Sequence, residues 1–394
     1  MQEPGAPGAS GAAALPTLRP RDAPTLSRAV AALHALRLPA LVRGGGTRLS
    51  LGNPPRPCAV VLSTLALAGV HDFDPGEGVC RVGAGTALAD LRAAVNAGGW
   101  ELPLDAPGRG STLGGTLAAA AIGPRAQGFG APRDQVLGLE VVLGDGVLAK
   151  CGGRVVKNVT GYDLAKLYTG SLGTLGVIAA AWLRLRPRPE RVEHLEAQAG
   201  DVASACARGL AAARSATARA AAVVLPACGV AARLVVELAG PEPAVRRDAA
   251  SLCADAGFAA ADASALDRVR RLQGDAAPAG GLRFRLWLRP SRLAAAAAAI
   301  AAAGGSLLLY PGLGQGFARF EPSAGAPPDA AFDAVARASG LGGGGHWVEQ
   351  APDAAYAGRD AFGDAGASAL LARALKARFD PVGVLNPGRA AGRA

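Results

Sequence analysis

The segment Val42-Arg43-Gly44-Gly45-Gly46-Thr47-Arg48-Leu49 decides the fold that we expect for this chain. It follows a short apolar stretch that predicts a buried strand. Three consecutive glycines then let the backbone turn several N–H groups toward one anion. We therefore predict a phosphate-binding loop here, and a flexible turn is the alternative that this segment alone leaves open.

A second glycine-rich segment runs from Gly108 to Thr116 and precedes an alanine-rich helix that we expect over Leu117 to Ala121. Its polar residues are expected to cap this helix, and the helix N-terminus would favour a second phosphate. The residues assigned here to the phosphate site are Pro107, Gly108, Ser111, Thr112, Gly114 and Gly115.

A third segment, Gly170 to Ile178, predicts a strand that the chain enters through glycines spaced by three. Glycine in such a place lets a flat ring or a phosphate lie against the main chain. The residues assigned to the site from this segment are Gly170, Ser171, Gly173, Thr174, Gly176, Val177 and Ile178.

Composition limits the class of protein. The 394 residues are 50% hydrophobic and 18% charged, which predicts a globular chain of two domains, or one large fold with an insertion. The net charge is +10, but the basic residues are spread thinly and only four of the 41 are lysines. We therefore expect no nucleic-acid binding. The positive charge is more consistent with binding a phosphate-bearing cofactor or an acidic partner.

Several common sites are missing from the sequence. The six cysteines lie at least 22 positions apart, so no zinc or iron–sulfur spacing occurs, and we expect reduced, mostly buried thiols and a cytoplasmic location. The four histidines form no local metal pair, and neither a P-loop nor a G-x-S-x-G elbow is present. The segment from Gly83 to Leu88 fails the dinucleotide fingerprint at its last position. We expect residues 1–19 to form a disordered leader, and Leu293 to Tyr310 to form a helix and strand rather than a membrane span.

The order of these motifs resembles the FAD-binding domain of the vanillyl-alcohol oxidase family, also called the p-cresol methylhydroxylase type. The resemblance includes Asp134 to Gly146, and Val156 to Leu167 with Gly161. These last residues, with the C-terminal run Gly383 to Arg389 that contains Asn386, are similar to the FAD-binding subunits of bacterial glycolate oxidases. The expected fold class is α+β: a two-part FAD-binding domain of this type with a smaller α+β cap domain.

The resemblance also implies a domain order. Residues 20–187 would form the FAD-binding domain, residues 190–365 a cap that binds substrate or a partner, and residues 366–394 a helix and tail that return to the FAD domain. The proline-punctuated segment Arg184 to Arg191 is the expected linker. Because Gly46 and Thr47 stand where covalent members of the family carry a histidine or cysteine, the resemblance implies noncovalent FAD.

The sequence of the expected cap domain contains few residue patterns that indicate a function. Related D-2-hydroxyacid dehydrogenases hold a metal there with paired histidines and a glutamate, and this chain shows no such pairing, so no metal is expected. His346 with Glu349, or Arg285, Tyr310 and Arg319 on expected strands, are the candidates for binding a carboxylate substrate or moving a proton. A structural role for each is the alternative.

The leading functional expectation is the FAD-binding subunit of a glycolate oxidase complex that converts glycolate to glyoxylate. The resemblance implies hydride transfer from the α-carbon to flavin N5, and partners that comprise a second FAD-containing subunit and an iron–sulfur subunit. Any attachment to the inner membrane would be peripheral and through those partners. Two alternatives stay open: a stand-alone FAD-dependent dehydrogenase of another 2-hydroxy acid or alcohol, and an assembly or electron-relay subunit with a non-catalytic FAD.

Overall fold

The computed structural model describes residues 15–154, 162–227, 231–275, 277–278, 280–322, 328–363 and 366–394. Its contacts divide the chain into two units. Unit 1 contains the residues up to Ala121, Ala131–Pro187 and Tyr356–Ala394, and unit 2 contains Ile122–Gly130 and Arg188–Ala355. Residues 1–14 of the expected leader lie outside the described residues.

Unit 1 is built on two sheets. A parallel sheet has the order β1-β3-β2, an antiparallel sheet has the order β4-β5-β9-β7-β8, and β6 pairs with β10. The strands are β1 (Thr17–Leu18), β2 (Ala40–Arg43), β3 (Val60–Ser63), β4 (Val70–Asp74), β5 (Val79–Gly83), β6 (Trp100–Glu101), β7 (Val136–Val142), β8 (Leu148–Gly152), β9 (Val177–Arg184) and β10 (Arg186–Pro187). The helices are α1 (Ala23–Ala35), α2 (Leu88–Ala97), α3 (Leu113–Ala118), α5 (Leu164–Tyr168) and α11 (Gly366–Phe379), with short 3-10 turns at Pro132–Asp134 and Ala391–Arg393.

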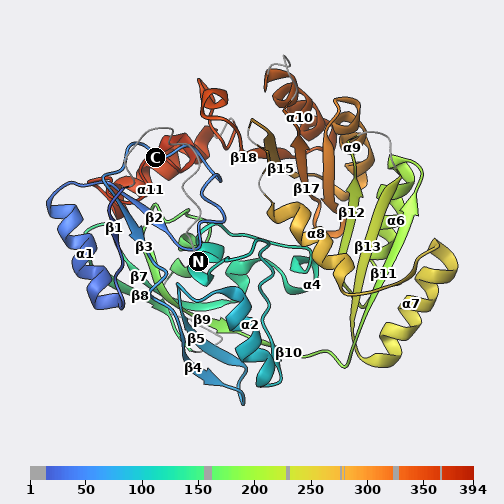
Figure 1. The fold of residues 1–394 in the computed structure, drawn as a ribbon, viewed down its shortest axis with the longest axis horizontal. Coiled ribbons are helices and arrows are strands. Elements are labelled where there is room, and N and C mark those ends of the chain that lie inside the picture. The colour runs from blue at the N-terminus through green and yellow to red at the C-terminus, as the bar shows by residue number, and fades with distance from the viewer. Residues whose placement is uncertain are drawn as a thin grey trace. The chain divides into compact units, whose positions relative to one another are not determined.

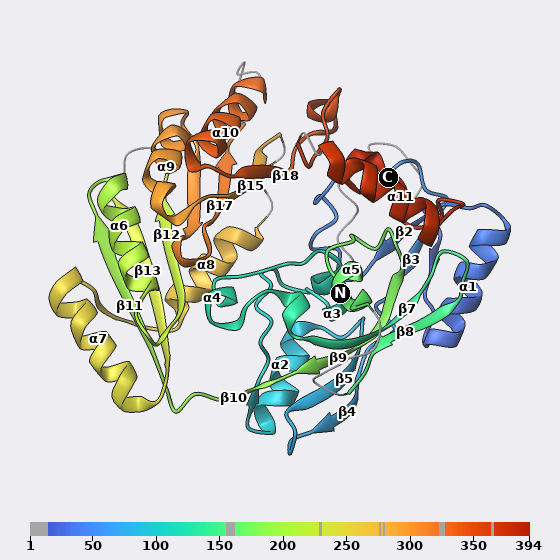
Figure 2. The same ribbon diagram turned by 180° about the vertical axis from the view of Figure 1, so that it is seen from behind.

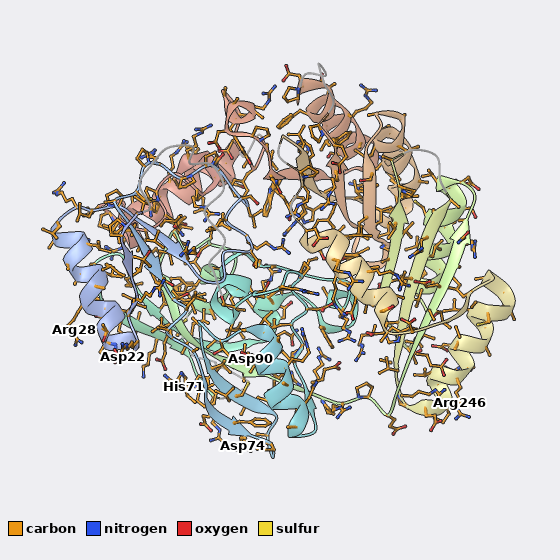
Figure 3. All side chains as sticks on the ribbon, in the orientation of Figure 1. Asp22, Arg28, His71, Asp74, Asp90 and Arg246 are labelled. Atoms are coloured by element: carbon orange, nitrogen blue, oxygen red, sulfur yellow. The ribbon has the colours of Figure 1, made fainter. Side chains whose placement is uncertain are left out.

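Local sequence explains where these elements begin. Asp22 caps α1, because its carboxylate accepts a hydrogen bond from the backbone N–H of Thr25 at 2.7 Å, and Figure 3 shows Asp22 at one end of this helix. The strands β7 and β8 form a hairpin, since they pair antiparallel across a turn that contains Gly146.

The two ends of unit 1 lie side by side although they are far apart in sequence. Leu385 forms a parallel bridge with Ala40 of β2, and the backbone N–H of Ala40 donates to Val384 O at 2.7 Å. Figures 1 and 2 show the red C-terminal segment next to the blue strands β2 and β3. This arrangement brings the C-terminal run to the first glycine loop.

Unit 2 holds one eight-stranded sheet in the order β14-β11-β13-β12-β16-β17-β15-β18. The strands are β11 (Arg191–Ala199), β12 (Ala218–Leu225), β13 (Ala232–Gly240), β14 (Ala259–Ala261), β15 (Leu282–Trp287), β16 (Ser306–Tyr310), β17 (Gln315–Phe320) and β18 (Gly345–Gln350). The helices are α4 (Ala126–Phe129), α6 (Val202–Ala213), α7 (Glu242–Ala256), α8 (Ser264–Gly274), α9 (Leu293–Ala302) and α10 (Pro328–Gly342), and 3-10 turns lie at Pro290–Arg292, Pro311–Leu313 and Asp353–Tyr356.

This sheet consists of two halves that repeat the same arrangement of strands and helices. Each half follows the order strand, helix, strand, strand, helix, strand, with the last strand next to the first, and β12 and β16 join the halves antiparallel. The helices α6, α7, α9 and α10 lie on one side of the sheet, and α8, which connects the halves, lies on the other (Figure 1). The expectation of a smaller α+β cap domain did not include this repeat.

A buried carboxylate anchors the excursion of residues 122–130 within unit 2. Glu237 is fully buried on β13, and Arg125 donates to its two oxygens at 2.8 and 2.7 Å. Arg219 donates to the same carboxylate at 2.6 Å, and His194 Nε2 lies 3.0 Å from it. Three basic side chains therefore compensate one buried charge.

One expectation about local structure was wrong. The alanine-rich helix starts at Leu113, not Leu117, and ends at Ala118, because Thr112 is its N-cap and Ala120 adopts a φ of 43°. The expected linker from Arg184 to Arg191 contains the boundary between the two units, which lies between Pro187 and Arg188, and it also holds the end of β9, all of β10 and the start of β11. The α+β fold class itself is confirmed.

Candidate functional site

Unit 1 contains a pocket formed by the first two glycine-rich segments and the C-terminal run. Its lining combines glycines, threonines and alanines with three larger apolar residues and two arginines. The lining residues are Val42, Gly44, Gly45, Gly46, Thr47, Arg48, Leu49, Thr112, Gly115, Ala118, Ala119, Leu172 and Arg389.

Hydrogen bonds hold the first two segments together. The hydroxyls of Thr47 and Ser111 lie 3.3 Å apart, and Nη2 of Arg48 donates to Pro107 O at 3.2 Å. Ser111 also donates to the carbonyls of Pro107 and Gly108, at 3.0 and 2.9 Å. The predicted residues Pro107, Gly108 and Ser111 thus shape the loops around the pocket, although they do not line it.

The glycines of these loops have two different roles. A Cβ on Gly45 would lie 1.8 Å from Gly110 O, and one on Gly44 would lie 2.5 Å from Thr112 Oγ1. Gly114 likewise packs on Ala84, with 2.7 Å to its Cβ. At these three positions glycine is required by close contact between protein segments, so a side chain there would disrupt the loops before reaching any ligand.

Gly46 and Gly115 have fewer close neighbours. A Cβ on Gly46 would have no neighbour nearer than 3.9 Å, and one on Gly115 would meet only Thr112 Oγ1, at 3.1 Å. The φ of 75° at Gly46 by itself favours glycine. Both residues line the pocket, so their missing side chains also leave room for a ligand that lies against the backbone.

Asn386 connects the third segment to the first. Its Oδ1 accepts from the backbone N–H of Val42 at 2.8 Å, and its Nδ2 donates to Leu172 O at 2.7 Å. Asn386 is 1% exposed and has a φ of 43°. A Cβ on Gly173 would meet Asn386 Nδ2 at 3.0 Å, which explains the glycine there.

A buried ion pair fixes the C-terminal run. Nζ of Lys376 lies 2.6 Å from Oδ2 of Asp380 and donates to Thr174 O and Leu385 O at 2.8 and 2.6 Å. Burial lowers the pKa of Lys376, and the negative charge of Asp380 opposes that shift. The backbone N–H groups of Val384 and Leu385 donate to Asp380 in turn, so the carboxylate is fully engaged.

The structure brings part of the predicted cofactor site together. Eight predicted residues line the pocket: Gly44, Gly45, Gly46, Thr47, Arg48, Leu49, Thr112 and Gly115. Arg43 lies at the end of β2. The third segment contributes Leu172 to the lining, while Gly176 packs on Val141, and Val177 and Ile178 belong to the core. Gly161 lies outside the described residues. Direct contact of these residues with a cofactor stays a prediction.

Five lining residues were not assigned to the site from the sequence, although Val42 begins the first glycine segment. They are Val42, Ala118, Ala119, Leu172 and Arg389. Four are apolar and carry no chemical signal in a sequence. Arg389 ends the C-terminal run whose Asn386 was assigned, so its position next to that asparagine was the available signal.

The pocket fits a phosphate-bearing cofactor. Its lining includes two arginines and no aspartate or glutamate, so its charge favours an anion. The space at Gly46 and Gly115 exposes backbone to a ligand, as phosphate binding by main-chain N–H groups requires. Neither cysteine nor histidine belongs to the lining.

The catalytic candidates of unit 2 lie on opposite sides of its sheet. Arg285 is paired with buried Glu349 at 2.6 Å, and Tyr310 donates to Gln273 Oε1 at 2.7 Å, on the side that α8 covers. His346 instead lies 3.1 Å from the hydroxyl of Ser339 on α10, and burial lowers its pKa.

Arg319 forms hydrogen bonds with the C-terminal end of α8. It donates to the carbonyls of Leu272 and Asp275, at 3.2 and 2.6 Å, and Arg283 donates to those of Gln273 and Asp275. Arginines at a helix C-terminus satisfy its last carbonyls. His346 and Glu349 are thus not brought together, and a catalytic role for any of these residues stays a prediction.

Among the described residues, His, Cys, Asp and Glu side chains do not gather in groups of three that could ligate a metal. No described helix has the length and apolar character needed to cross a membrane.

Comparison with known families identifies the domain that holds the pocket. Residues 14–152 match the family model described as an FAD binding domain. The chain therefore contains an FAD-binding domain, and the cofactor expected from the sequence is confirmed as FAD.

Curated relatives match less than half of the chain. The glycolate oxidase subunit GlcE of Escherichia coli (strain K12) is 36% identical over 155 residues, which are 39% of this chain and 44% of GlcE. The mitochondrial D-2-hydroxyglutarate dehydrogenase of Bos taurus is 38% identical over 176 residues, 44% of this chain and 32% of the enzyme. The matched segments thus span less than half the length of these relatives.

The fold has a counterpart among solved structures. An alkyldihydroxyacetonephosphate synthase superposes with a TM-score of 0.70 at 15% identity, over 94% of this chain and 75% of the synthase. At that identity the likeness concerns the fold alone.

Proposed function

We propose that this chain, whose FAD-binding domain holds the pocket described above, is an FAD-dependent oxidoreductase of the 2-hydroxy-acid dehydrogenase type. More narrowly, we propose that it is the FAD-binding subunit of a glycolate oxidase. The single observation that carries the proposal is the glycine-rich pocket with two arginines, most of whose lining lies within the residues that match an FAD binding domain, while Leu172 and Arg389 come from later in the chain. The similarity to a glycolate oxidase subunit and to a D-2-hydroxyglutarate dehydrogenase supports the substrate class.

Bound FAD would supply an acceptor for the two electrons removed from the α-carbon of the hydroxy acid. The protein's part is to bind and orient the cofactor. Gly46 and Gly115 would let its phosphates approach the backbone, and Arg48 would contribute positive charge. Because the lining contains no cysteine or histidine, we propose that the flavin is bound noncovalently.

The residues of unit 2 support a need for partner subunits. Arg285, Arg319, Tyr310 and His346 each have a partner inside unit 2, so none is an obvious free group to clamp a substrate carboxylate or accept its proton. We propose that the partners are a second flavoprotein and an iron–sulfur subunit. An assembly or electron-relay role for this subunit is the second candidate that the same observation favours.

The test is anaerobic reduction of the bound flavin. Glycolate, D-lactate or D-2-hydroxyglutarate is added to the FAD-loaded chain alone and to the chain purified with its partner subunits, and absorbance near 450 nm is followed. We expect no bleaching within minutes for the isolated chain, and bleaching by glycolate in the complex. Rapid bleaching of the isolated chain would instead establish a stand-alone dehydrogenase, and no bleaching in the complex would favour the relay role.

A further inference from the structure

Arg389 is a buried cation in the wall of the cofactor pocket. Its side chain comes from the C-terminal run, is 3% exposed, and lines the pocket together with the first glycine loop. Arginine is almost never buried to this extent unless its charge is paired. A group close to Arg389 should therefore compensate this charge.

One edge of the guanidinium is occupied by backbone carbonyls. Nη2 donates to Leu51 O at 2.6 Å, to Leu49 O at 2.9 Å and to Arg48 O at 3.4 Å. These three carbonyls belong to the segment that completes the first glycine loop. Arg389 thus fixes the shape of that loop from 338 or more positions away in sequence.

The Nε–H group has no such partner. Nε of Arg389 is buried and has no hydrogen-bond partner among the described residues, and the side-chain hydrogen bonds described for Arg389 all start at Nη2. A buried donor without an acceptor costs about 1 to 3 kcal/mol. Nε therefore favours an acceptor that the described residues do not supply.

Among the described residues, no carboxylate forms an ion pair with Arg389. Burial lowers the pKa of Arg389 to about 10, and the groups that oppose this shift are the Cys58 thiol and the Tyr356 hydroxyl, not an aspartate or glutamate. Arg389 is still a cation at neutral pH. The carbonyl dipoles at Nη2 offset part of the cost of burying it, and an anion in the pocket would offset the rest.

We propose that Arg389 is the charged ligand of the pyrophosphate of FAD and at the same time the residue that shapes the loop beside it. The inference rests on the proposed FAD site, and it adds a specific cation to a site otherwise built from backbone. A guanidinium suits this double task, because it presents several donors in a fixed plane and keeps its charge when buried. Arg48, which also lines the pocket, donates to Pro107 O and is the second positive charge of the lining.

The test compares Arg389→Met and Arg389→Lys with the parent chain, all freed of flavin. FAD binding is measured by fluorescence titration, and ADP and adenosine are measured as competitors, because only ADP carries the pyrophosphate. We expect ADP to compete at least 10-fold better than adenosine in the parent. Arg389→Met should weaken FAD binding at least 10-fold and bring ADP and adenosine to within 3-fold of each other. Arg389→Lys should retain part of the ADP preference, since it keeps the charge.

Arg373→Met is the matched control, because Arg373 is exposed on α11. It should leave FAD and ADP binding within 2-fold of the parent. Should Arg389→Met fail to fold, judged by circular dichroism, the Lys variant and the ADP preference of the parent still decide the matter.

Two results would overturn the inference while leaving the FAD site in place. One is weaker FAD binding in Arg389→Met with the ADP preference unchanged, which would make Arg389 a loop-shaping residue only. The other is a parent that binds FAD but shows no preference for ADP over adenosine. A parent that binds no FAD at all would instead remove the proposed function, and this inference with it.

Discussion

Oδ1 of Asn386 accepts a hydrogen bond from the backbone N–H of Val42 at 2.8 Å, although 344 positions separate the two residues. The same side chain donates to Leu172 O, so one asparagine joins the strand before the first glycine loop, the third glycine segment and the C-terminal run. The pocket thus depends on contacts between the two ends of the chain. This gives the end of the sequence a direct part in the cofactor site.

The first prediction concerns this asparagine. Asn386→Ala would leave a buried N–H and a buried carbonyl without partners and would place alanine at a φ of 43°, so we expect the free energy of unfolding to fall by about 3 kcal/mol. Urea denaturation of the flavin-free chain measures it. Asn96→Ala, at an exposed position of α2, should change the free energy by less than about 0.5 kcal/mol. Equal effects of the two variants would show that the bridge does not stabilise the unit.

The second prediction fills the space at Gly115. A leucine there would occupy the pocket, and the helical backbone of Gly115 in α3 accepts a side chain, although its Cβ would lie 3.1 Å from the capping oxygen of Thr112. We expect Gly115→Leu to lose FAD binding by at least about 100-fold, a penalty of about 2.7 kcal/mol, while the chain stays folded with at most a small fall in its melting temperature. Equilibrium dialysis and circular dichroism measure the two quantities.

Gly340→Leu is the control for this variant, since Gly340 is an exposed glycine of α10 with no neighbour within 4 Å of a Cβ. It should keep full FAD binding. A folded Gly115→Leu chain with undiminished FAD affinity would place the cofactor elsewhere.

The third prediction concerns the buried charge of unit 2. Burial alone would raise the pKa of Glu237, but hydrogen bonds from His194, Arg125 and Arg219 outweigh it and hold the pKa far below the usual value. The resulting stability is present above the ordinary carboxyl pKa of 4.5 and is lost as the pH falls below it. As the pH is lowered from 5 to 3, the free energy of unfolding of Glu237→Gln should fall less steeply than that of the parent.

At neutral pH the same variant leaves three basic groups without their carboxylate and should lose about 3 to 5 kcal/mol. Asp333→Ala, at an exposed site on α10, serves as the control and should follow the parent at every pH. If the free energy of unfolding fell equally steeply between pH 5 and pH 3 in Glu237→Gln and in the parent, this account of the buried cluster would be contradicted.

The fourth prediction concerns alkaline pH. Burial, reinforced by Asp72, raises the pKa of the Cys80 thiol from 9.0 to about 12. Above pH 9 the unfolded chain releases this proton and the folded chain does not, so stability falls with rising pH by up to about 1.4 kcal/mol per pH unit from this group. Cys80→Ala should show a shallower loss between pH 9 and 11, whereas Cys253→Ala, which removes an exposed thiol, should keep the slope of the parent. Matching slopes in all three proteins would exclude Cys80 as the source.

Part of the fold and of the site could be predicted from the sequence because the signals are local. The glycine run at 44–46, the helix cap at Thr112 and the hairpin around Gly146 each depend on neighbours within a few positions. Eight of the predicted cofactor residues accordingly meet in one pocket.

The remaining features depend on contacts between distant residues. Arg389 and Leu51 are 338 positions apart, and Arg125 and Glu237 are 112 apart, so neither pair can be recognised from spacing. The strand β12 is rich in alanine, which fits a helix as well as a strand, and this concealed the repeat in unit 2. The packing contacts that require glycine at positions 45 and 114 could not be predicted from the sequence either, because the groups that these glycines contact lie on other segments.

The measurement that tests the central claim most directly is a titration of FAD into the purified, flavin-free chain, followed by acid precipitation of the complex. The account predicts one FAD bound per chain, no comparable binding of NAD, and release of the flavin into the acid supernatant. A chain that binds no FAD, or binds NAD in its place, would contradict the assignment of the pocket. Flavin that stays with the precipitated polypeptide would contradict noncovalent binding.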